Sequence, residues 1–134
     1  MADTVTSQTI QDGGKTAVLK FTNESDGSGE SSVKKVDVSE LATDSAGNAC
    51  TSVSIARIYW ACRGMGVDIE FDATTNVLAT TLPANSTGDE YYDLFGSIPN
   101  NAGSGVTGDI DFTTVGASSG DAYSIILVLH KNYS

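Results

Sequence analysis

The segment GVDIEFD (66–72) alternates apolar and acidic residues without interruption. Successive side chains of a β-strand point to opposite faces, so Val67, Ile69 and Phe71 share one face and the acidic residues share the other. This alternation predicts a strand with one face in a protein core and the other in water. No part of the chain shows a sustained helical period of 3.6 residues, and the sequence therefore predicts an all-β fold.

Seven further segments on either side of GVDIEFD are rich in β-branched and apolar residues, which favours strands. They span residues 4–10, 15–21, 33–41, 51–62, 76–82, 108–115 and 121–131. Clusters of Gly, Ser, Asn and Asp separate them, and these residue types form turns. The spacing indicates a β-sandwich of about eight strands, in a single domain over residues 1–134. EYYDLF (90–95) is either a ninth strand or one helical turn.

The alternation within the predicted strands also identifies a candidate core. KTAVLKF (15–21), for example, places Ala17, Leu19 and Phe21 on one face and Lys20 on the other. The predicted core comprises Leu19, Phe21, Val36, Val38, Ile55, Ile69, Phe71, Ile110, Phe112, Ile125 and Leu127.

The segment SIILVLHK (124–131) is apolar on both faces of its predicted strand, with Ile126 and Val128 on the second face. Each sheet of a two-layer sandwich has one inner face, so the second face of this strand needs a cover. VSIARIYW (53–60) is also apolar on both faces, and it adds Ile58 and Trp60 to the candidate interface residues. The cover is the segment 4–10, the loop 96–108 or a neighbouring subunit, and we favour the neighbouring subunit.

The charge of the chain excludes several classes of partner. The formal net charge is −10, and the seven Lys and Arg residues are scattered, so no cationic track exists for a nucleic acid or an anionic membrane. No apolar run is long enough for a transmembrane helix, and the N-terminus lacks the pattern of a signal peptide. We therefore expect folding inside a cell. Cys50 and Cys62 are expected to be reduced thiols there, since a disulfide between them needs an oxidising environment.

The search for catalytic and metal-binding residues finds none. His130 is the only histidine and sits at a strand end close to the C-terminus. Asp68, Glu70 and Asp72 share one strand face, but exposed acidic rows are common and no calcium-loop pattern surrounds them. No glycine-rich segment matches a phosphate-binding motif. The sequence therefore predicts a non-enzymatic protein with no cofactor and no metal.

Aromatic residues leave one binding alternative open. Trp60, Tyr59, Tyr91, Tyr92 and Phe95 could line a platform on which sugars stack, although such residues more often fill a core or an interface.

Three segments together cover most of the chain and resemble one class of proteins. They are LKFTNESDGSGESSVKKVDVSEL (19–41), GMGVDIEFDATTNVLATTLPA (64–84) and TGDIDFTTVGASSGDAYSIILVLHKN (107–132). Their texture is similar to that of small acidic virion structural proteins of tailed bacteriophages. The resemblance implies a jelly-roll-like sandwich on the exterior of the phage head, a capsid decoration or cement protein that binds the major capsid protein as a dimer or trimer.

Two rival functions stay open at this point. The domain could be a connector or completion protein of the phage tail or neck, which would be present in far fewer copies than a decoration protein. Alternatively, it could be a carbohydrate-binding jelly-roll module of a receptor-binding structure. In the favoured interpretation the protein assembles in the host cytoplasm and resides in the virion, where it contacts copies of itself.

Overall fold

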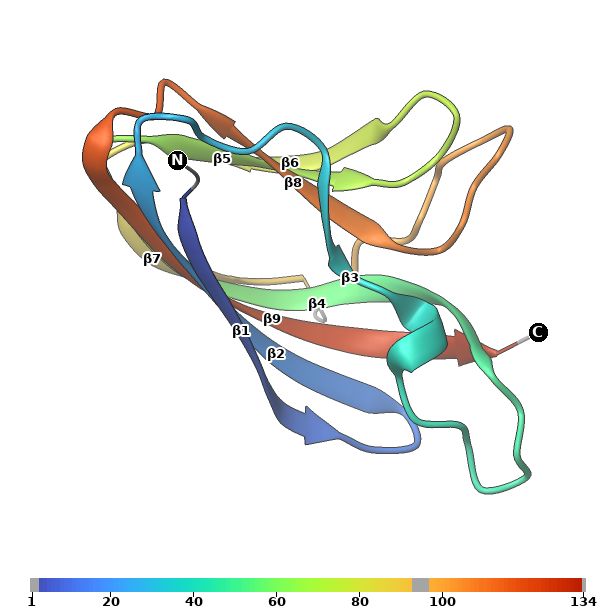
Figure 1. The fold of residues 1–134 in the computed structure, drawn as a ribbon. Coiled ribbons are helices and arrows are strands. Elements are labelled where there is room, and N and C mark those ends of the chain that lie inside the picture. The colour runs from blue at the N-terminus through green and yellow to red at the C-terminus, as the bar shows by residue number, and fades with distance from the viewer. Residues whose placement is uncertain (1–2, 93–96, 134) are drawn as a thin grey trace.

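The computed structural model describes residues 3–92 and 97–133, and in this part of the chain it contains nine strands and one short 3-10 helix (Figure 1). The strands are β1 (Thr4–Asp12), β2 (Thr16–Asp26), β3 (Val33–Val36), β4 (Cys50–Arg63), β5 (Gly66–Phe71), β6 (Val77–Leu82), β7 (Thr87–Tyr91), β8 (Ile110–Val115) and β9 (Ser119–Tyr133). The 3-10 helix, η1, spans Val38–Glu40. Within these residues no helix has the length and apolarity needed to cross a membrane.

The strands form two antiparallel sheets with a nested pairing. β2 pairs with β9, β3 with β8, β4 with β7 and β5 with β6, as in one long hairpin that has been rolled up. The resulting orders are β1-β2-β9-β4-β7 in a five-stranded sheet and β3-β8-β5-β6 in a four-stranded sheet. Two four-stranded sheets connected in this way form a jelly roll, to which β1 adds an extra edge strand. The predicted all-β, jelly-roll-like sandwich is confirmed.

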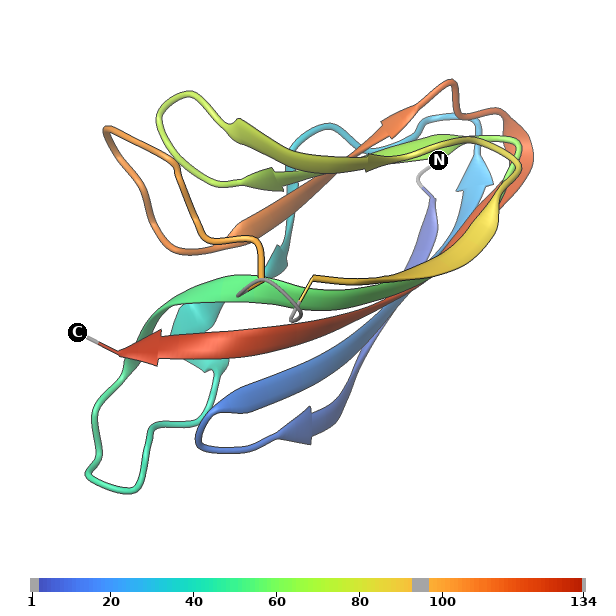
Figure 2. The ribbon, with the colours of Figure 1, turned by 180° about the vertical axis from the view of Figure 1, so that it is seen from behind.

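The core lies between the two sheets, which face one another in both views of the ribbon (Figure 2). All eleven residues that the sequence predicted for the core are buried. Phe112 of the four-stranded sheet packs edge-on against Phe21 and Tyr123 of the five-stranded sheet, with ring centroids 5.4 and 5.9 Å apart. These aromatic contacts join the two layers.

Two strand boundaries differ from the prediction because polar side chains find partners inside the fold. β2 continues to Asp26, beyond the predicted end at residue 21, since the buried Asn23 and Ser25 both donate hydrogen bonds to the Asp3 carboxylate. The predicted strand 33–41 ends early because the Asp37 carboxylate accepts a hydrogen bond from the Ser39 backbone N–H and caps η1.

Part of the segment EYYDLF (90–95) belongs to a ninth strand. Residues 90 and 91 are the last two of β7, which pairs with β4. Residues 93–96 lie outside the described part of the chain. The alternative of a single helical turn over 90–95 is therefore excluded at residues 90 and 91, and the rest of it falls mainly on residues outside the described part of the chain.

Candidate interaction surface

A β-bulge in β4 decides which of its side chains face the core. Ile55 pairs with Leu129 and Arg57 pairs with Val128, so Ala56 is an extra residue opposite β9. The extra residue places Ile55 and Ile58 on the same, inner face, whereas simple alternation assigns them to opposite faces. Ile58 is fully buried in the protein's own core. Its assignment to an interface was therefore wrong.

Trp60 also lies on the inner face and not on an open one. It pairs with Ile125 across the sheet and packs at the margin of the hydrophobic core. Its indole Nε1–H donates a hydrogen bond to Ser86 Oγ at 3.0 Å. Gly88 lies directly against the indole ring, and a Cβ there would approach it to 2.9 Å. Unlike Ile58, Trp60 is only partly buried, so its place in an interface stays a prediction.

The outer face of the five-stranded sheet carries the other two candidates together with residues that the sequence did not single out. Ile126 lies between Lys20 of β2 and Tyr59 of β4, and Val128 lies between Val18 of β2 and Arg57 of β4. We call the set around these two residues the outer patch. It comprises Val18, Arg57, Tyr59, Tyr91, Ile126 and Val128.

Among the described residues, the outer patch is covered only from the side. Ile126 and Val128 are both half-buried, because the longer side chains on the neighbouring strands flank them. The segment 4–10 does not lie over them, since β1 is an in-plane edge strand of the same sheet. The described part of the loop 96–108 begins beside β4, where Ile98 forms a backbone bridge with Ile55 in the plane of the sheet, and continues to the four-stranded sheet, where Thr107 contacts Asp72. Neither predicted internal cover is therefore present in the described residues.

Arg57 and two tyrosines form the polar end of the outer patch. The Arg57 guanidinium lies over the Tyr91 ring, 4.4 Å from its centroid, and the rings of Tyr59 and Tyr91 meet edge-on at 6.4 Å. The hydrogen bond with Tyr59 raises the pKa of Tyr91 above its usual value. Arg and Tyr are the residue types most enriched at the centres of protein interfaces.

The aromatic residues do not form a flat platform for sugars. Tyr59 and Tyr91 are inclined at 69° to each other, and one face of the Tyr91 ring is occupied by Arg57. Trp60 faces inward, and Tyr92 packs against the core. Phe95 lies outside the described residues.

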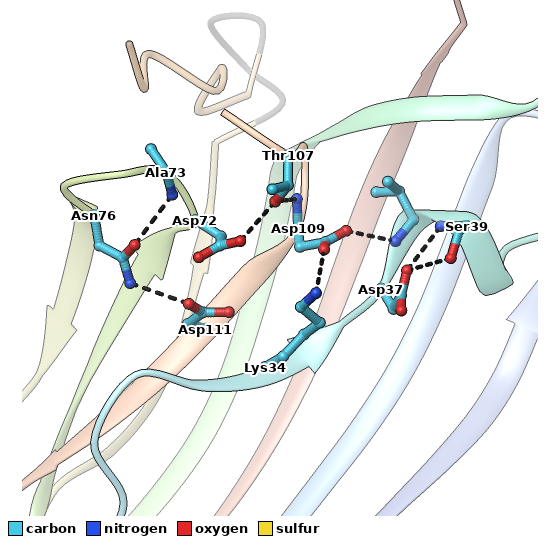
Figure 3. Close-up of polar contacts among 10 residues, drawn as sticks. Lys34, Asp37, Ser39, Asp72, Ala73, Asn76, Thr107, Asp109 and Asp111 are labelled. Atoms are coloured by element: carbon cyan, nitrogen blue, oxygen red, sulfur yellow. Dashed lines mark hydrogen bonds and ion pairs between the residues drawn. The ribbon is translucent and has the colours of Figure 1, made fainter. Parts of the chain in front are cut away.

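A group of carboxylates gathers at one end of the four-stranded sheet (Figure 3). The buried Asp109 accepts a hydrogen bond from the Val38 backbone N–H at 2.9 Å and pairs with the Lys34 ammonium at 2.9 Å. Asp72 accepts a hydrogen bond from Thr107 Oγ1 at 2.8 Å. These contacts tie η1, β3 and the strand end of β5 to the loop before β8. Their role is structural.

Asp111 belongs to the same group of carboxylates, and one of its oxygens has no hydrogen-bond partner in the described structure. The residue is buried, and its other carboxylate oxygen accepts a hydrogen bond from Asn76 Nδ2 at 3.0 Å. Burial and the neighbouring Asp72 carboxyl raise the pKa of Asp111 to about 6. Of the acidic row 68–72, Asp68 bonds to Thr81 and Glu70 bonds to Thr113. Across the described residues no three His, Cys, Asp or Glu side chains are arranged to hold a metal ion.

His130 lines a cleft of about 670 Å³ between the β1–β2 turn, the end of β9 and the loop before β4. Lys15, Tyr133 and Asp44 also line it. The Asp44 carboxylate is engaged by Asn48, and these hydrogen bonds hold the pKa of Asp44 below its usual range. The Tyr133 hydroxyl donates to the Gly14 carbonyl and not to His130. Among the described residues no hydroxyl of this cleft is hydrogen-bonded to His130.

The two cysteines lie at opposite ends of β4, at its first residue and its second-to-last residue. A strand rises roughly 3.3 Å per residue, which places the two thiols tens of ångströms apart. A disulfide requires Cα atoms within about 7 Å, so Cys50 and Cys62 cannot pair within one chain. Burial raises the pKa of both thiols.

Comparison with known proteins does not identify a family for this chain. No family model matches it, and no curated protein matches it. Among solved structures, an uncharacterized conserved protein with a double-stranded β-helix domain from Klebsiella pneumoniae subsp. pneumoniae MGH 78578 is 8% identical, with a TM-score of 0.39 over 94% of this chain and 76% of that one. A variant of CBM29-2, a family 29 carbohydrate-binding module, is 10% identical, with a TM-score of 0.42 over 96% of this chain and 93% of that one.

Both TM-scores lie below 0.5, so neither likeness carries an argument about what this chain does. The jelly-roll assignment stands on the strand order and the nested pairing of the chain itself. Neither of the two proteins is described as a phage structural protein, and the resemblance found in the sequence stays a hypothesis.

Proposed function

We propose that this domain is a non-enzymatic assembly protein, a virion structural protein of a tailed bacteriophage that decorates the head exterior and binds the major capsid protein through its outer patch. The resemblance of residues 19–41, 64–84 and 107–132 to such proteins supplies the class. The outer patch supplies the contact surface.

The observation that carries the proposal is the composition of the outer patch. Ile126 and Val128 form a half-buried aliphatic centre, and Arg57 and the two tyrosines lie beside it. Each aliphatic side chain is partly exposed to solvent and therefore lacks part of the roughly 1.5–3 kcal/mol of stabilisation that full burial provides. A partner surface that covers the patch recovers this free energy. Aromatic and Arg side chains beside an aliphatic centre are typical of such contacts.

The charge of the chain supports an exterior position in a particle. A net charge of −10 keeps a protein soluble at high copy number and repels packaged DNA.

The test is the paired substitution Ile126→Ser with Val128→Thr, assayed by co-sedimentation with shells of the major capsid protein that lack this domain. We expect the variant to remain folded, because both side chains face outward, and to lose at least about tenfold in affinity for the shells. Unchanged binding would contradict the proposal. The proposal would also be contradicted if the wild-type protein did not bind the shells.

Leu78→Ser is the matched control for that experiment. Leu78 is a large apolar residue that is 54% exposed, but it belongs to β6 of the other sheet. Its replacement removes comparable apolar surface far from the outer patch. We expect shell binding to be unchanged, and a loss equal to that of the paired variant would contradict the assignment to the outer patch.

The rival functions give different results in the same preparations. A tail or neck connector would be found as a single ring in purified particles, whereas a decoration protein covers the head. A carbohydrate-binding module would bind glycans and lose that binding on Tyr59→Ala, since Tyr59 is the aromatic residue that lies directly beside Ile126 in the outer patch.

A further inference from the structure

β1 is an open edge of the five-stranded sheet. It pairs with β2 on one side, and no backbone hydrogen bond reaches its other side from any described residue. Its first eight residues are exposed, on both faces of the strand. Every second residue of such a strand directs its N–H and C=O groups toward the free side, so β1 is a template for another strand.

The other three sheet edges are better protected against pairing. β7 has five residues and carries Asp89 and Glu90. β3 has four residues and carries Lys34 and Lys35. β6 has six residues, is interrupted by a bulge against β5 and is followed by Pro83. Short length, charges, bulges and proline are the features by which proteins block edge pairing. β1 has nine residues and only one bulge, near its end.

β1 is also electrically neutral where the rest of the chain is acidic. Residues 4–11 contain no ionisable side chain, in a protein with a net charge of −10. Val5 and Ile10 on this strand are 46% and 52% exposed. Two copies of the chain repel each other over most of their surfaces, but they do not repel along this edge.

The strand is held in place at both ends. Its preceding residue, Asp3, accepts hydrogen bonds from Asn23 Nδ2 at 3.1 Å and from the Gly29 N–H at 3.2 Å. Its last residue, Asp12, binds the buried Lys131 ammonium and accepts a hydrogen bond from the Ala42 N–H at 2.8 Å. An edge that is already ordered loses little conformational entropy when a second strand is added.

We infer that the β1 edges of two copies of this chain pair antiparallel to form a symmetric dimer with one continuous sheet. Identical strands that pair antiparallel are related by a two-fold axis, so the contact is self-complementary and closes at two copies. The partner is a second copy of this chain because the neutral, symmetric edge matches itself. Both β1 edges disappear in the dimer, and its outermost strands are the acidic β7 strands.

This inference deepens the proposed assembly function and rests on it, since it supplies the contact between copies. The two-fold axis of an antiparallel strand pair is perpendicular to the sheet, so both outer patches face the same side of the continuous sheet. A dimer of this kind therefore presents two patches to one capsid surface, and the second patch binds at a high effective concentration.

The test uses charged variants at two outer-face positions of β1 in the purified full chain. A two-fold symmetric antiparallel register places outer-face residues against outer-face residues, so when the two strands are centred on one another equal charges at positions 6 and 8 lie close to their copies in the partner. We expect Thr6→Lys with Gln8→Lys, and separately Thr6→Glu with Gln8→Glu, to weaken self-association at least about tenfold in sedimentation equilibrium. An equimolar mixture of the two variants should recover the dimer, as a heterodimer.

Several outcomes would overturn the inference. They are a monomeric wild-type protein over the whole concentration series, unchanged self-association of both charged variants, and no recovery in the mixture. Loss of self-association in Leu78→Lys but not in the β1 variants would assign the contact to β6 instead. Thermal unfolding checks that each variant is folded.

A capsid-protein strand as the partner of β1 would give a different pattern. In that case the wild-type protein is monomeric by itself, and only one of the two charged variants, the Lys pair or the Glu pair, weakens shell binding. This result would also overturn the inference. Self-association is measured without shells, and so its failure is distinguishable from a failure of shell binding by the outer patch.

Discussion

Asp111 shows how one buried side chain couples stability to pH. Its pKa is raised from 3.8 to about 6 by burial and by Asp72, so the folded state holds this proton up to a higher pH than the unfolded state does. The contribution of Asp111 to stability is therefore complete below pH 3.8 and is lost as the pH rises through 6. The interval between the two pKa values corresponds to a change of at most about 3 kcal/mol in the free energy of unfolding.

Replacing Asp111 by Asn should remove the loss of stability that accompanies ionisation of Asp111 at rising pH. The amide oxygen can still accept the hydrogen bond from Asn76, and it carries no charge to desolvate. We expect the variant to be more stable than wild type at about pH 7–8, by up to about 3 kcal/mol, and to gain little at about pH 4. Urea unfolding across this pH range measures the difference. An equal effect at both pH values would contradict the pKa of Asp111.

At the scale of the element, the bulge at Ala56 determines which side chains in the C-terminal part of β4 face the core. On its C-terminal side Ile58 is buried and Arg57 points outward. Deletion of Ala56 would remove only the extra residue and leave Arg57 opposite Val128 and Ile58 opposite Leu127. Insertion of a second alanine after Ala56, by contrast, would shift the C-terminal half of β4 by one residue and exchange these two positions. The exchange exposes Ile58, at about 1.5–3 kcal/mol, and forces the Arg57 charge toward the core at a larger cost.

We therefore expect insertion of an alanine after Ala56 to abolish cooperative unfolding, as monitored by near-UV circular dichroism and urea titration, and deletion of Ala56 to preserve it. Insertion of an alanine after Gly103 is the matched control, because this glycine lies in the loop before β8 and the space where its Cβ would stand is open. The free energy of unfolding of the control should lie within about 1 kcal/mol of the wild-type value. Cooperative unfolding of the Ala56 insertion variant, with a stability similar to that of wild type, would contradict this prediction.

At the scale of the whole molecule, Lys131 connects three segments that are distant in the chain. Its side chain is fully buried, and its ammonium contacts the Asp12 carboxylate, the Gly13 carbonyl at 2.6 Å and the Ala42 carbonyl at 3.1 Å. β9, the β1–β2 turn and the loop after η1 meet at this one group. The contact also holds the end of the β1 edge.

Replacement of Asp12 by Asn should leave this buried ammonium without a counter-charge. We expect a loss of about 3–5 kcal/mol in the free energy of unfolding, and faster hydrogen exchange in the loop that follows η1. Asp89→Asn on the exposed strand β7 is the matched control and should change stability by less than about 0.5 kcal/mol. A loss below about 1 kcal/mol for Asp12→Asn would mean that water replaces the carboxylate.

The sequence by itself determined the fold class, most strand positions and the core. Val67, Ile69 and Phe71 alternate with acids, and Ile125 and Leu127 alternate with Ile126 and Val128, because side-chain direction in a strand follows from local backbone geometry. These assignments need no knowledge of the partner strand. The prediction that Ile126 and Val128 face away from the core is confirmed on the same ground.

Only the tertiary structure decided where alternation is interrupted and which faces meet. Ala56 carries no mark of a bulge in the sequence, so the inward positions of Ile58 and Trp60 could not be predicted, nor could the outward meeting of Arg57 with Tyr91. The nested order of strands, which leaves β1 as an open edge, is likewise set by pairings between segments far apart in the chain. The physical reason is that a bulge and a sheet edge are properties of two paired strands, whereas the sequence pattern reports on one.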